Sequence, residues 1–297
     1  MTENLSARFA DIDLWPTSEA LEAMYEGQLA ALAAFQPRID ALARAADAAA
    51  KLLRGHGRLV YVGAGTSGRL AVLDGVELGP TFGWPDERVL FLVAGGREAL
   101  TLSVEGAEDD AGQAVADFGN AKIDEHDVVI GVAASGTTPY TVSALQAAAA
   151  AGALTIGIAN NPDTPLLSSV QHSILVETGG ELVAGSTRMK AGTAQKAILN
   201  MLSTAIMLRL DRIYKGQMVD MIVSNNKLED RAARIVSDIS GCAETVATRS
   251  LTAANRNIKQ AVLIARGLSP ADSQSVLRRA EGSLRRALSE IDNRKQL

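Results

Sequence analysis

Glycine and hydroxyl side chains gather in a short stretch, residues 63–70, whose composition is typical of a phosphate-binding turn. The stretch reads Gly-Ala-Gly-Thr-Ser-Gly-Arg-Leu and follows the apolar run Leu-Val-Tyr-Val. Glycines let a backbone approach an anion closely, and the first free N–H groups of a following helix attract that anion. We therefore expect Gly65, Thr66 and Ser67 to bind phosphate. An ordinary strand-to-helix turn is the alternative.

A second stretch of this kind, residues 134–141, reads Ala-Ser-Gly-Thr-Thr-Pro-Tyr-Thr and also follows an apolar run. Ligands bind outside the carboxyl ends of the strands in an open parallel sheet, so two such turns can close on one phosphate. Either turn alone could be ordinary Ser or Thr capping of a helix. The pair favours phosphate binding, with these residues of the second turn as ligands: Ser135, Gly136, Thr137 and Thr138.

A third segment, residues 181–196, combines glycines, hydroxyls and bases just before and within the start of a long apolar helix. Such groups suit an anion at the positive end of the helix. The expected ligands are Ser186, Arg188 and Lys190, and a solvated helix start is the alternative.

The first turn also matches the Gly-x-Gly-x-x-Gly fingerprint of dinucleotide-binding proteins. That fingerprint requires an acidic residue after the next strand, roughly 20 residues on. Here the next apolar run, residues 89–94, ends in Gly95 and Gly96, and its nearby acids Asp86 and Glu87 precede it. The missing acid weakens the dinucleotide interpretation, so we expect a compact phosphomonoester ligand and no cofactor.

The apolar pattern predicts an α/β protein. Residues 18–54 have helical periodicity with a break near Pro37, whereas short apolar runs alternate with helical stretches from residue 59 onward. This alternation indicates a three-layer α-β-α architecture around a roughly five-stranded parallel sheet. The apolar runs are 59–62, 89–94, 128–133, 154–158 and 173–176. The expected divisions are a helical N-terminal segment 1–55, a sheet domain 56–220 and a small helical C-terminal subdomain 221–297.

Composition argues against several classes of partner. The 297 residues carry 34 acids and 29 bases, a net charge of -5, which gives no general attraction to nucleic acid or acidic membranes. No apolar run approaches the roughly 20 residues of a membrane-spanning helix, and no signal sequence is recognisable. We expect a soluble cytoplasmic protein. The single cysteine, Cys242, excludes an internal disulfide, and three scattered histidines predict no metal site.

Four motifs together resemble the sugar isomerase (SIS) superfamily and, within it, the N-acetylmuramic acid 6-phosphate etherase family. They are residues 63–70, 104–109 (Val-Glu-Gly-Ala-Glu-Asp), 133–136 (Ala-Ala-Ser-Gly) and 186–196 (Ser-Thr-Arg-Met-Lys-Ala-Gly-Thr-Ala-Gln-Lys). The resemblance implies the SIS fold and a cytoplasmic homodimer. It also implies cleavage of the lactyl ether of a sugar phosphate, giving N-acetylglucosamine 6-phosphate and D-lactate during recycling of cell-wall amino sugars.

The resemblance places the family's two functional carboxylates on Glu77 and Glu108. Opening of the sugar ring would acidify the proton on carbon 2, and loss of lactate from carbon 3 would follow. One group must remove that proton, and another must protonate the departing oxygen and later activate water; two carboxylates with separated pKa values can do both. By resemblance Glu108 is the base and Glu77 the acid. Glu105 is the alternative base, and Asp109 is a weaker one.

This chain departs from the family pattern in two places. It has Gly-Val-Glu-Leu-Gly-Pro at residues 75–80 where the family usually carries Ala-Ser-Glu-Cys-Pro-Pro. It has Tyr25-Glu26-Gly27 where Asn-Glu-Asp is usual.

Three other functions are compatible with parts of this pattern. An aldose–ketose isomerase on the same fold would use one base to move a proton between carbons 1 and 2. A non-catalytic sugar-phosphate sensor, of the kind that glucokinase regulatory protein exemplifies, would need neither carboxylate. A dinucleotide-dependent dehydrogenase lacks its expected acid.

The helix after Gly192 is apolar nearly all round and therefore requires cover on more than one face. The parallel sheet covers one face, and we expect a second copy of the chain to cover another. Burial within one chain, with the N-terminal helices as cover, is the alternative. The apolar positions are Ala194, Ala197, Ile198, Met201, Leu202, Ala205, Ile206 and Leu208.

Overall fold

The chain, described over residues 1–294 in a computed structural model, divides into two compact units. The first contains Met1–Val76 and Asp86–Ile206, and the second contains Glu77–Pro85 and the chain from Met207 onward. The helical lead-in thus lies in the same unit as the sheet. The expected boundaries at residues 55/56 and 220/221 stay a prediction.

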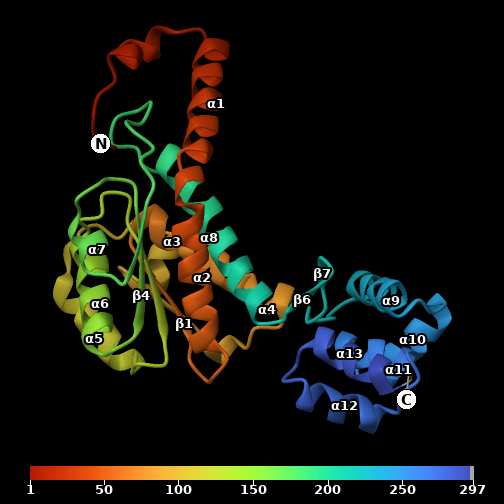
Figure 1. Ribbon diagram of the computed structural model, residues 1–297. Helices are drawn as coiled ribbons and strands as arrows, with labels where there is room; N and C mark the ends of the chain where they lie inside the picture. The colour runs from red at the N-terminus through yellow and green to blue at the C-terminus, as the bar shows by residue number, and fades with distance from the viewer. Residues whose placement is uncertain (295–297) are drawn as a thin grey trace. The chain divides into compact units, whose positions relative to one another are not determined.

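A five-stranded parallel sheet of order β2-β1-β3-β4-β5 forms the centre of the first unit (Figure 1). Every residue of the two strands β1 and β3 is buried, which explains why they read as continuous apolar runs. The predicted runs are confirmed as β1 (Leu59–Gly63), β2 (Val89–Val93), β3 (Val128–Val132), β4 (Leu154–Ala159) and β5 (His172–Leu175).

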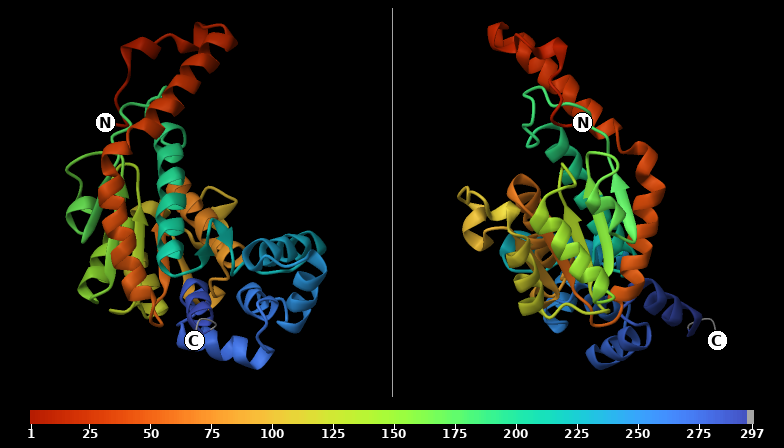
Figure 2. Two further views of the ribbon diagram at one scale, coloured as in Figure 1. Left: turned by 45° about the vertical axis from the view of Figure 1, so that its right-hand side comes forward. Right: turned by 90° about the vertical axis from the view of Figure 1, so that its left-hand side faces the viewer.

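Helices cover both faces of this sheet, so the predicted three-layer architecture is confirmed. In Figure 1, and again in the two views of Figure 2, α2, α3 and α8 lie on one face and α5, α6 and α7 on the other. Pro37 lies in the short turn between α1 and α2, as predicted. The α-helices are α1 (Thr17–Ala33), α2 (Ile39–Leu53), α3 (Gly65–Val76), α5 (Ala111–Ala121), α6 (Pro139–Ala150), α7 (Pro165–Ser168) and α8 (Lys190–Arg209). The 3-10 turns are η1 (Ala7–Phe9), η2 (Ile12–Leu14), η3 (Gln36–Arg38), η4 (Asp86–Arg88), η5 (Gly96–Leu100) and η6 (Ala107–Asp109).

The second unit is mainly helical, as the sequence predicts. It has its own apolar core, in which Val236, Leu251 and Val262 are almost fully buried. Its elements are α4 (Leu78–Phe82), the antiparallel pair β6 (Ile213–Tyr214) and β7 (Gln217–Met218), α9 (Asn226–Ser240), α10 (Glu244–Ala253), α11 (Ile258–Ala265), α12 (Pro270–Arg279) and α13 (Leu284–Arg294). Among the described helices of the chain, none is both long and apolar enough to cross a membrane.

A buried ion pair joins the starts of β1 and β3. Asp127 is almost fully buried, and its Oδ1 accepts hydrogen bonds from the backbone N–H of Arg58 at 2.8 Å and from Arg58 Nε at 3.1 Å. Burial acts to raise the pKa of Asp127. The hydrogen bonds from Arg58 outweigh that effect, and the pKa of the carboxyl lies below its ordinary value of 3.8.

We expect Asp127→Asn to lower the free energy of unfolding by about 3 kcal/mol. This value is at the low end of the range for a broken buried ion pair, because the Arg58 side chain is partly exposed. A lowered folded-state pKa contributes stability above the unfolded pKa and loses it as the pH falls through the folded pKa. The deficit of the variant should therefore shrink below about pH 3.8. Urea titrations across pH measure it, with the exposed Glu87→Gln as control. A constant deficit at all pH values would contradict the ion-pair account.

Candidate active site

The first Gly-rich turn connects β1 to α3 at the carboxyl end of the sheet. Gly65 has a φ of +51°, a left-handed conformation that favours glycine, and it begins the helix. Thr66 is half-buried and Ser67 is buried, whereas Gly65 is exposed. The turn therefore presents glycine backbone and one hydroxyl side chain to the space beyond the strand.

That space is a pocket of about 360 Å³, whose other wall is the loop that precedes α5. Gly65, Thr66 and Arg69 line it from the first turn, and Glu105 and Glu108 line it from the loop. The glycine turn and two carboxylates thus line one cavity within the first unit. Across residues 1–294, no group of three or more His, Cys, Asp or Glu side chains is placed to hold a metal ion.

Glu108 lies in the 3-10 turn η6, directly before α5. Gly106, with a φ of +73°, reverses the chain before this turn, and the Asp110 side chain caps α5 by accepting from Gln113 N at 2.8 Å. The turn also contacts α6, which begins immediately after the second Gly-rich turn. Local capping and the contact with α6 hold the exposed Glu108 carboxylate in the pocket that the first turn also lines. Glu105 is exposed in the same pocket, so both candidates for the base remain.

Arg69 joins α3 to the segment that precedes the carboxylates of the pocket, a contact that no sequence motif indicated. Its Nε donates to the carbonyl oxygen of Ala99 at 2.9 Å, and its Nη2 donates to that of Leu102 at 2.8 Å. These bonds tie the first turn of α3 to the segment that leads into the carboxylate loop. The first motif ends in Gly-Arg-Leu and so contains this arginine, but the motif does not indicate which carbonyl groups the arginine contacts.

The second Gly-rich turn is organised around the Ser135 hydroxyl. Ser135 Oγ accepts from Thr137 N at 3.2 Å and lies 3.4 Å from Thr138 Oγ1. Gly136 has a φ of +71°, and a Cβ there would meet the side chain of Thr164 at 2.4 Å. The structure thus brings the predicted ligands of this turn together, at the carboxyl end of β3.

The third segment contains a contact that the sequence did not reveal. Buried Glu181 accepts from the backbone N–H of Lys190 and of Ala191, both at 2.9 Å, so the protein's own carboxylate occupies the first amides of α8. Lys190 Nζ donates to Gly180 O at 3.0 Å. Ser186 is half-buried and Arg188 is exposed.

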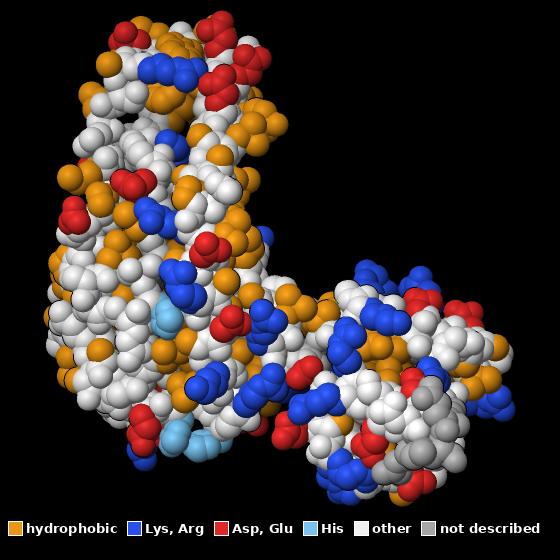
Figure 3. Space-filling view, in the orientation of Figure 1, with side chains coloured by type: hydrophobic (Ala, Val, Ile, Leu, Met, Phe, Trp, Pro, Cys, Tyr) orange, Lys and Arg blue, Asp and Glu red, His pale blue; other side chains and the backbone are white. Residues whose placement is uncertain are grey.

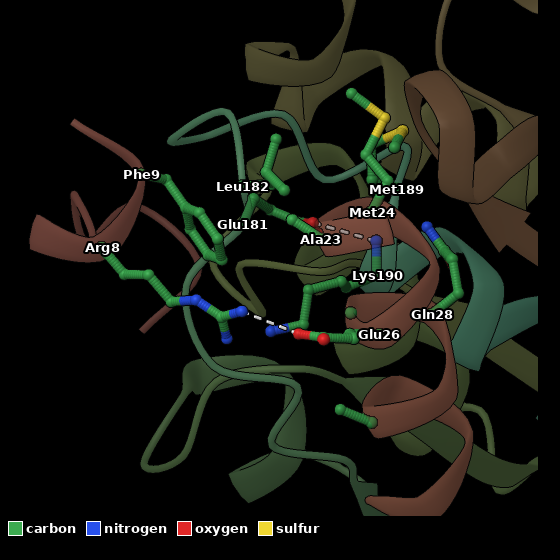
Figure 4. Close-up of a pocket in the computed structure, with 12 residues that line it drawn as sticks. Arg8, Phe9, Ala23, Met24, Glu26, Gln28, Glu181, Leu182, Met189 and Lys190 are labelled. Carbon is green, nitrogen blue, oxygen red and sulfur yellow. Dashed lines mark hydrogen bonds and ion pairs between the residues drawn. The ribbon is translucent and has the colours of Figure 1, made fainter. Parts of the chain in front are cut away.

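Lys190 lines a second cavity, of about 320 Å³, between α1, the loop before α8 and the N-terminal arm, residues 1–16. In Figure 4 its side chain lies in the middle of this cavity, with the ion pair of Arg8 and Glu26 (2.8 Å) to one side and Gln28 to the other. The structure therefore does not place Lys190 among the residues that line the Glu108 pocket. A phosphate role for Ser186, Arg188 and Lys190 stays a prediction.

Glu77 lies in the second unit, immediately before α4, and is exposed. Packing explains why this chain has Gly75 where the family usually has alanine. A Cβ at Gly75 would meet the Phe91 ring at 2.4 Å and the Tyr61 ring at 3.0 Å. Two stacked aromatic rings thus take the room that an alanine would need. The backbone of α3 approaches the sheet closely here.

The chain itself covers most of the apolar surface of α8. Ala194, Ile198, Leu202 and Ile206 are each at most 1% exposed. The alternative of burial within a single chain accounts for these four side chains. Ala197, Met201 and Ala205 are half-buried, so a contact between copies through that face of α8 stays a prediction. Leu208 is the exposed member of the predicted set, at 51%.

Two family models match overlapping parts of the chain. The model described as the glucokinase regulatory protein N-terminal SIS domain matches residues 41–149, and the SIS domain model matches residues 109–205. Together they cover the sheet and the two Gly-rich turns.

Curated relatives match nearly the whole chain, and each bears the name N-acetylmuramic acid 6-phosphate etherase. The Deinococcus radiodurans protein is 46% identical over 97% of this chain and 95% of its own length. The Rubrobacter xylanophilus protein is 43% identical over 98% and 96%. The Symbiobacterium thermophilum protein is 45% identical over 89% and 87%.

Solved structures share the fold. An Escherichia coli CFT073 protein, solved as a complex, is 20% identical, with a TM-score of 0.50 over 70% of this chain and 97% of its own. A Bacteroides fragilis protein described as a phosphosugar isomerase of capsule formation is 22% identical, with a TM-score of 0.51 over 68% and 95%. At these identities the likeness establishes the fold alone. On the identities of its curated relatives, the chain belongs to the N-acetylmuramic acid 6-phosphate etherase family and has the SIS fold.

Proposed function

We propose that the protein cleaves the D-lactyl ether of N-acetylmuramic acid 6-phosphate by elimination and water addition. The products are N-acetylglucosamine 6-phosphate and D-lactate, and the reaction serves recycling of cell-wall amino sugars in the cytoplasm. One observation of the structure carries this proposal: the Gly65 turn and the carboxylates Glu105 and Glu108 line the same pocket. Membership of the etherase family supplies the substrate.

The phosphate of the substrate is proposed to bind between the two Gly-rich turns. Backbone N–H groups of both turns and the hydroxyls of Thr66, Ser135 and Thr138 would donate to it. Ser67 would contribute its backbone N–H, because its hydroxyl donates to Gln195 Oε1 at 2.9 Å. Neutral donors bind a dianion without a fixed opposite charge, and each bond to a charged group contributes about 1.5–3 kcal/mol.

The proposed chemistry then uses the two carboxylates in turn. Glu108 removes the carbon 2 proton of the open-chain sugar, and Glu77 protonates the lactate oxygen as the bond to carbon 3 breaks. Glu77 then takes a proton from the water that adds to carbon 3. Each group starts the next cycle in its original state once the carbon 2 proton is returned.

Incubation of the purified protein with N-acetylmuramic acid 6-phosphate, followed by an enzymatic assay for D-lactate, tests the proposal. Release of lactate in step with N-acetylglucosamine 6-phosphate is expected. An isomerised sugar with its lactyl group intact would indicate the isomerase alternative. Tight binding of the sugar phosphate without any product would indicate the sensor alternative.

We further propose a homodimer in which α1 forms the contact between copies. Leu21, Tyr25, Leu29 and Leu32 recur every three or four residues along α1 and are 39–65% exposed, so they form one apolar stripe. Figure 3 shows hydrophobic side chains along the edge of the molecule where α1 lies. A contiguous exposed apolar patch of this kind is typical of a protein interface.

The double variant Tyr25→Glu/Leu29→Glu is therefore expected to be monomeric, because charges on the stripe oppose its burial. Light scattering at micromolar concentration should give twice the 31.1 kDa chain mass for the natural protein and one chain mass for the variant. Val115→Glu, which alters an exposed apolar residue on α5, is the control and should stay dimeric. A natural protein of one chain mass would exclude the dimer, and a dimeric double variant would exclude this interface.

A further inference from the structure

A buried chain of amide hydrogen bonds connects the first Gly-rich turn to the strand ends. Ser67 Oγ donates to Gln195 Oε1 at 2.9 Å, and Gln195 Nε2 donates to Asn160 Oδ1 at 2.8 Å. Asn160 Nδ2 in turn donates to the carbonyl oxygen of Val176 at 3.0 Å. Ser67, Gln195 and Asn160 are 8%, 1% and 2% exposed, so water cannot readily replace a lost partner.

The direction of every bond in this chain follows from its last acceptor. A carbonyl oxygen accepts only, so Asn160 must present its NH₂ to Val176 and its Oδ1 to Gln195. Gln195 must then present its own NH₂ to Asn160 and its Oε1 to Ser67. The single proton of Ser67 is therefore committed to Gln195, and it can reach a phosphate only by leaving that partner.

The second Gly-rich turn is attached to the same series of hydrogen bonds. The backbone N–H of Asn160 donates to Ala134 O at 3.0 Å, and Asn161 Nδ2 donates to the same oxygen at 3.2 Å. Ala134 directly precedes Ser135. The two adjacent asparagines therefore fix the residue from which the second turn starts.

The N-terminal arm contacts this network through Thr2 and Asn161. Thr2 is fully buried; its backbone N–H donates to Asn161 Oδ1, and its Oγ1 accepts from Asn161 Nδ2, both at 2.9 Å. The carbonyl oxygen of Thr2 accepts from Gly185 N at 3.3 Å. The arm thus joins the loops that follow β3, β4 and β5.

We propose that Gln195, Asn160 and Asn161 form a positioning relay that sets the spacing of the two Gly-rich turns, and that Thr2 locks it. The proposal rests on one part of the proposed function, namely that the two turns bind the substrate's phosphate. A broken relay leaves buried groups unpaired and frees the turns, so phosphate binding weakens. Glu108 lies in η6, before α5, and takes no part in the hydrogen bonds of the relay, so kcat is expected to change little.

Gln195→Met tests the relay, because methionine has a similar length but neither an amide donor nor a strong acceptor. The KM for the sugar phosphate and the dissociation constant for inorganic phosphate, followed by phosphorus NMR, should both rise about tenfold, with kcat within about threefold. Gln146→Met, at an exposed position on α6, is the matched control and should change none of these values. Ser135→Ala, which removes a proposed ligand directly, should raise the same two constants.

Thr2→Val and Thr2→Ser extend the test to the arm, and they keep it decisive if Gln195→Met does not fold. Thr2→Val should raise both constants, because it removes the Oγ1 acceptor. Thr2→Ser keeps a hydroxyl at this position and should leave both constants as they are in the natural protein. Unchanged phosphate affinity in the Gln195 and Thr2→Val variants would overturn the proposal, as would a loss confined to kcat. A natural protein that binds phosphate but releases no lactate would instead refute the proposed function, and the phosphate titration would still test the relay.

Discussion

Glu108→Gln is expected to lose both lactate release and exchange of the carbon 2 proton with solvent. The amide has nearly the shape of the carboxylate but cannot accept the proton, so no base remains at the reacting carbon. A general base contributes about 10²–10⁴ to the rate, and we expect a loss in that range. Proton NMR in deuterated water follows the exchange, and the lactate assay follows turnover.

Two neighbouring acids provide the comparison for this variant. Asp109→Gln and Glu105→Gln alter exposed acids of the same loop, and both should retain most of the exchange. If Glu108→Gln exchanged and turned over normally while Glu105→Gln lost both activities, the role of base would belong to Glu105. Because both glutamates line the pocket, only this comparison separates them.

Glu77→Gln is expected to separate the two halves of the reaction. Removal of the carbon 2 proton does not require a group that protonates the lactate oxygen, so proton exchange should persist in part. Departure of lactate does require it, and turnover should fall by about 10²–10⁴. The ratio of exchange to lactate release, measured in one sample, should therefore rise sharply compared with the natural protein.

Glu244→Gln is the control for this second variant, since Glu244 is also an exposed acid of the second unit. It should leave exchange and turnover unchanged. Unaltered lactate release by Glu77→Gln would remove Glu77 from the mechanism, and equal loss of both activities would show that it acts before proton removal.

The strands and Gly-rich turns could be predicted because their causes are local. A strand buried on both faces of a parallel sheet must be apolar throughout, as β1 and β3 are, and a helix that follows such a strand needs a tight turn. Gly65 and Gly136, both at positive φ, occur where those turns were expected. Short-range pattern was therefore enough to predict the sheet and the two turns at its carboxyl edge.

The supports of the site depend on partners far away in the sequence. Gln195 stands 128 residues from Ser67, and Asn161 stands 159 residues from Thr2. A glutamine in a helix or a threonine near the chain's start has no local feature that identifies such a partner. Glu181 is similar, because a capping carboxylate is recognisable only once the loop has brought it to the first amides of α8.

The environment of α8 shows how cover for an apolar helix can come from within the same chain. Its apolar circumference does require cover on more than one face, but α3 supplies part of that cover through buried Asp74. The Asp74 carboxylate accepts from Asn200 Nδ2 at 2.6 Å and from Ser203 Oγ at 3.1 Å. A continuous exposed apolar stripe lies on α1. Polar residues alternate with its members in the sequence, so the pattern of α1 did not indicate a helix that needs cover on more than one face.

Conversion of N-acetylmuramic acid 6-phosphate in heavy-oxygen water, followed by mass spectrometry of both products, tests the central proposal most directly. Elimination followed by water addition breaks the bond between carbon 3 and the lactyl oxygen, so the heavy atom must enter the sugar at carbon 3. Authentic N-acetylglucosamine 6-phosphate, incubated in the same water, corrects for exchange at carbon 1. We predict one additional heavy oxygen in the sugar and none in D-lactate; heavy oxygen in the lactate hydroxyl would contradict the account.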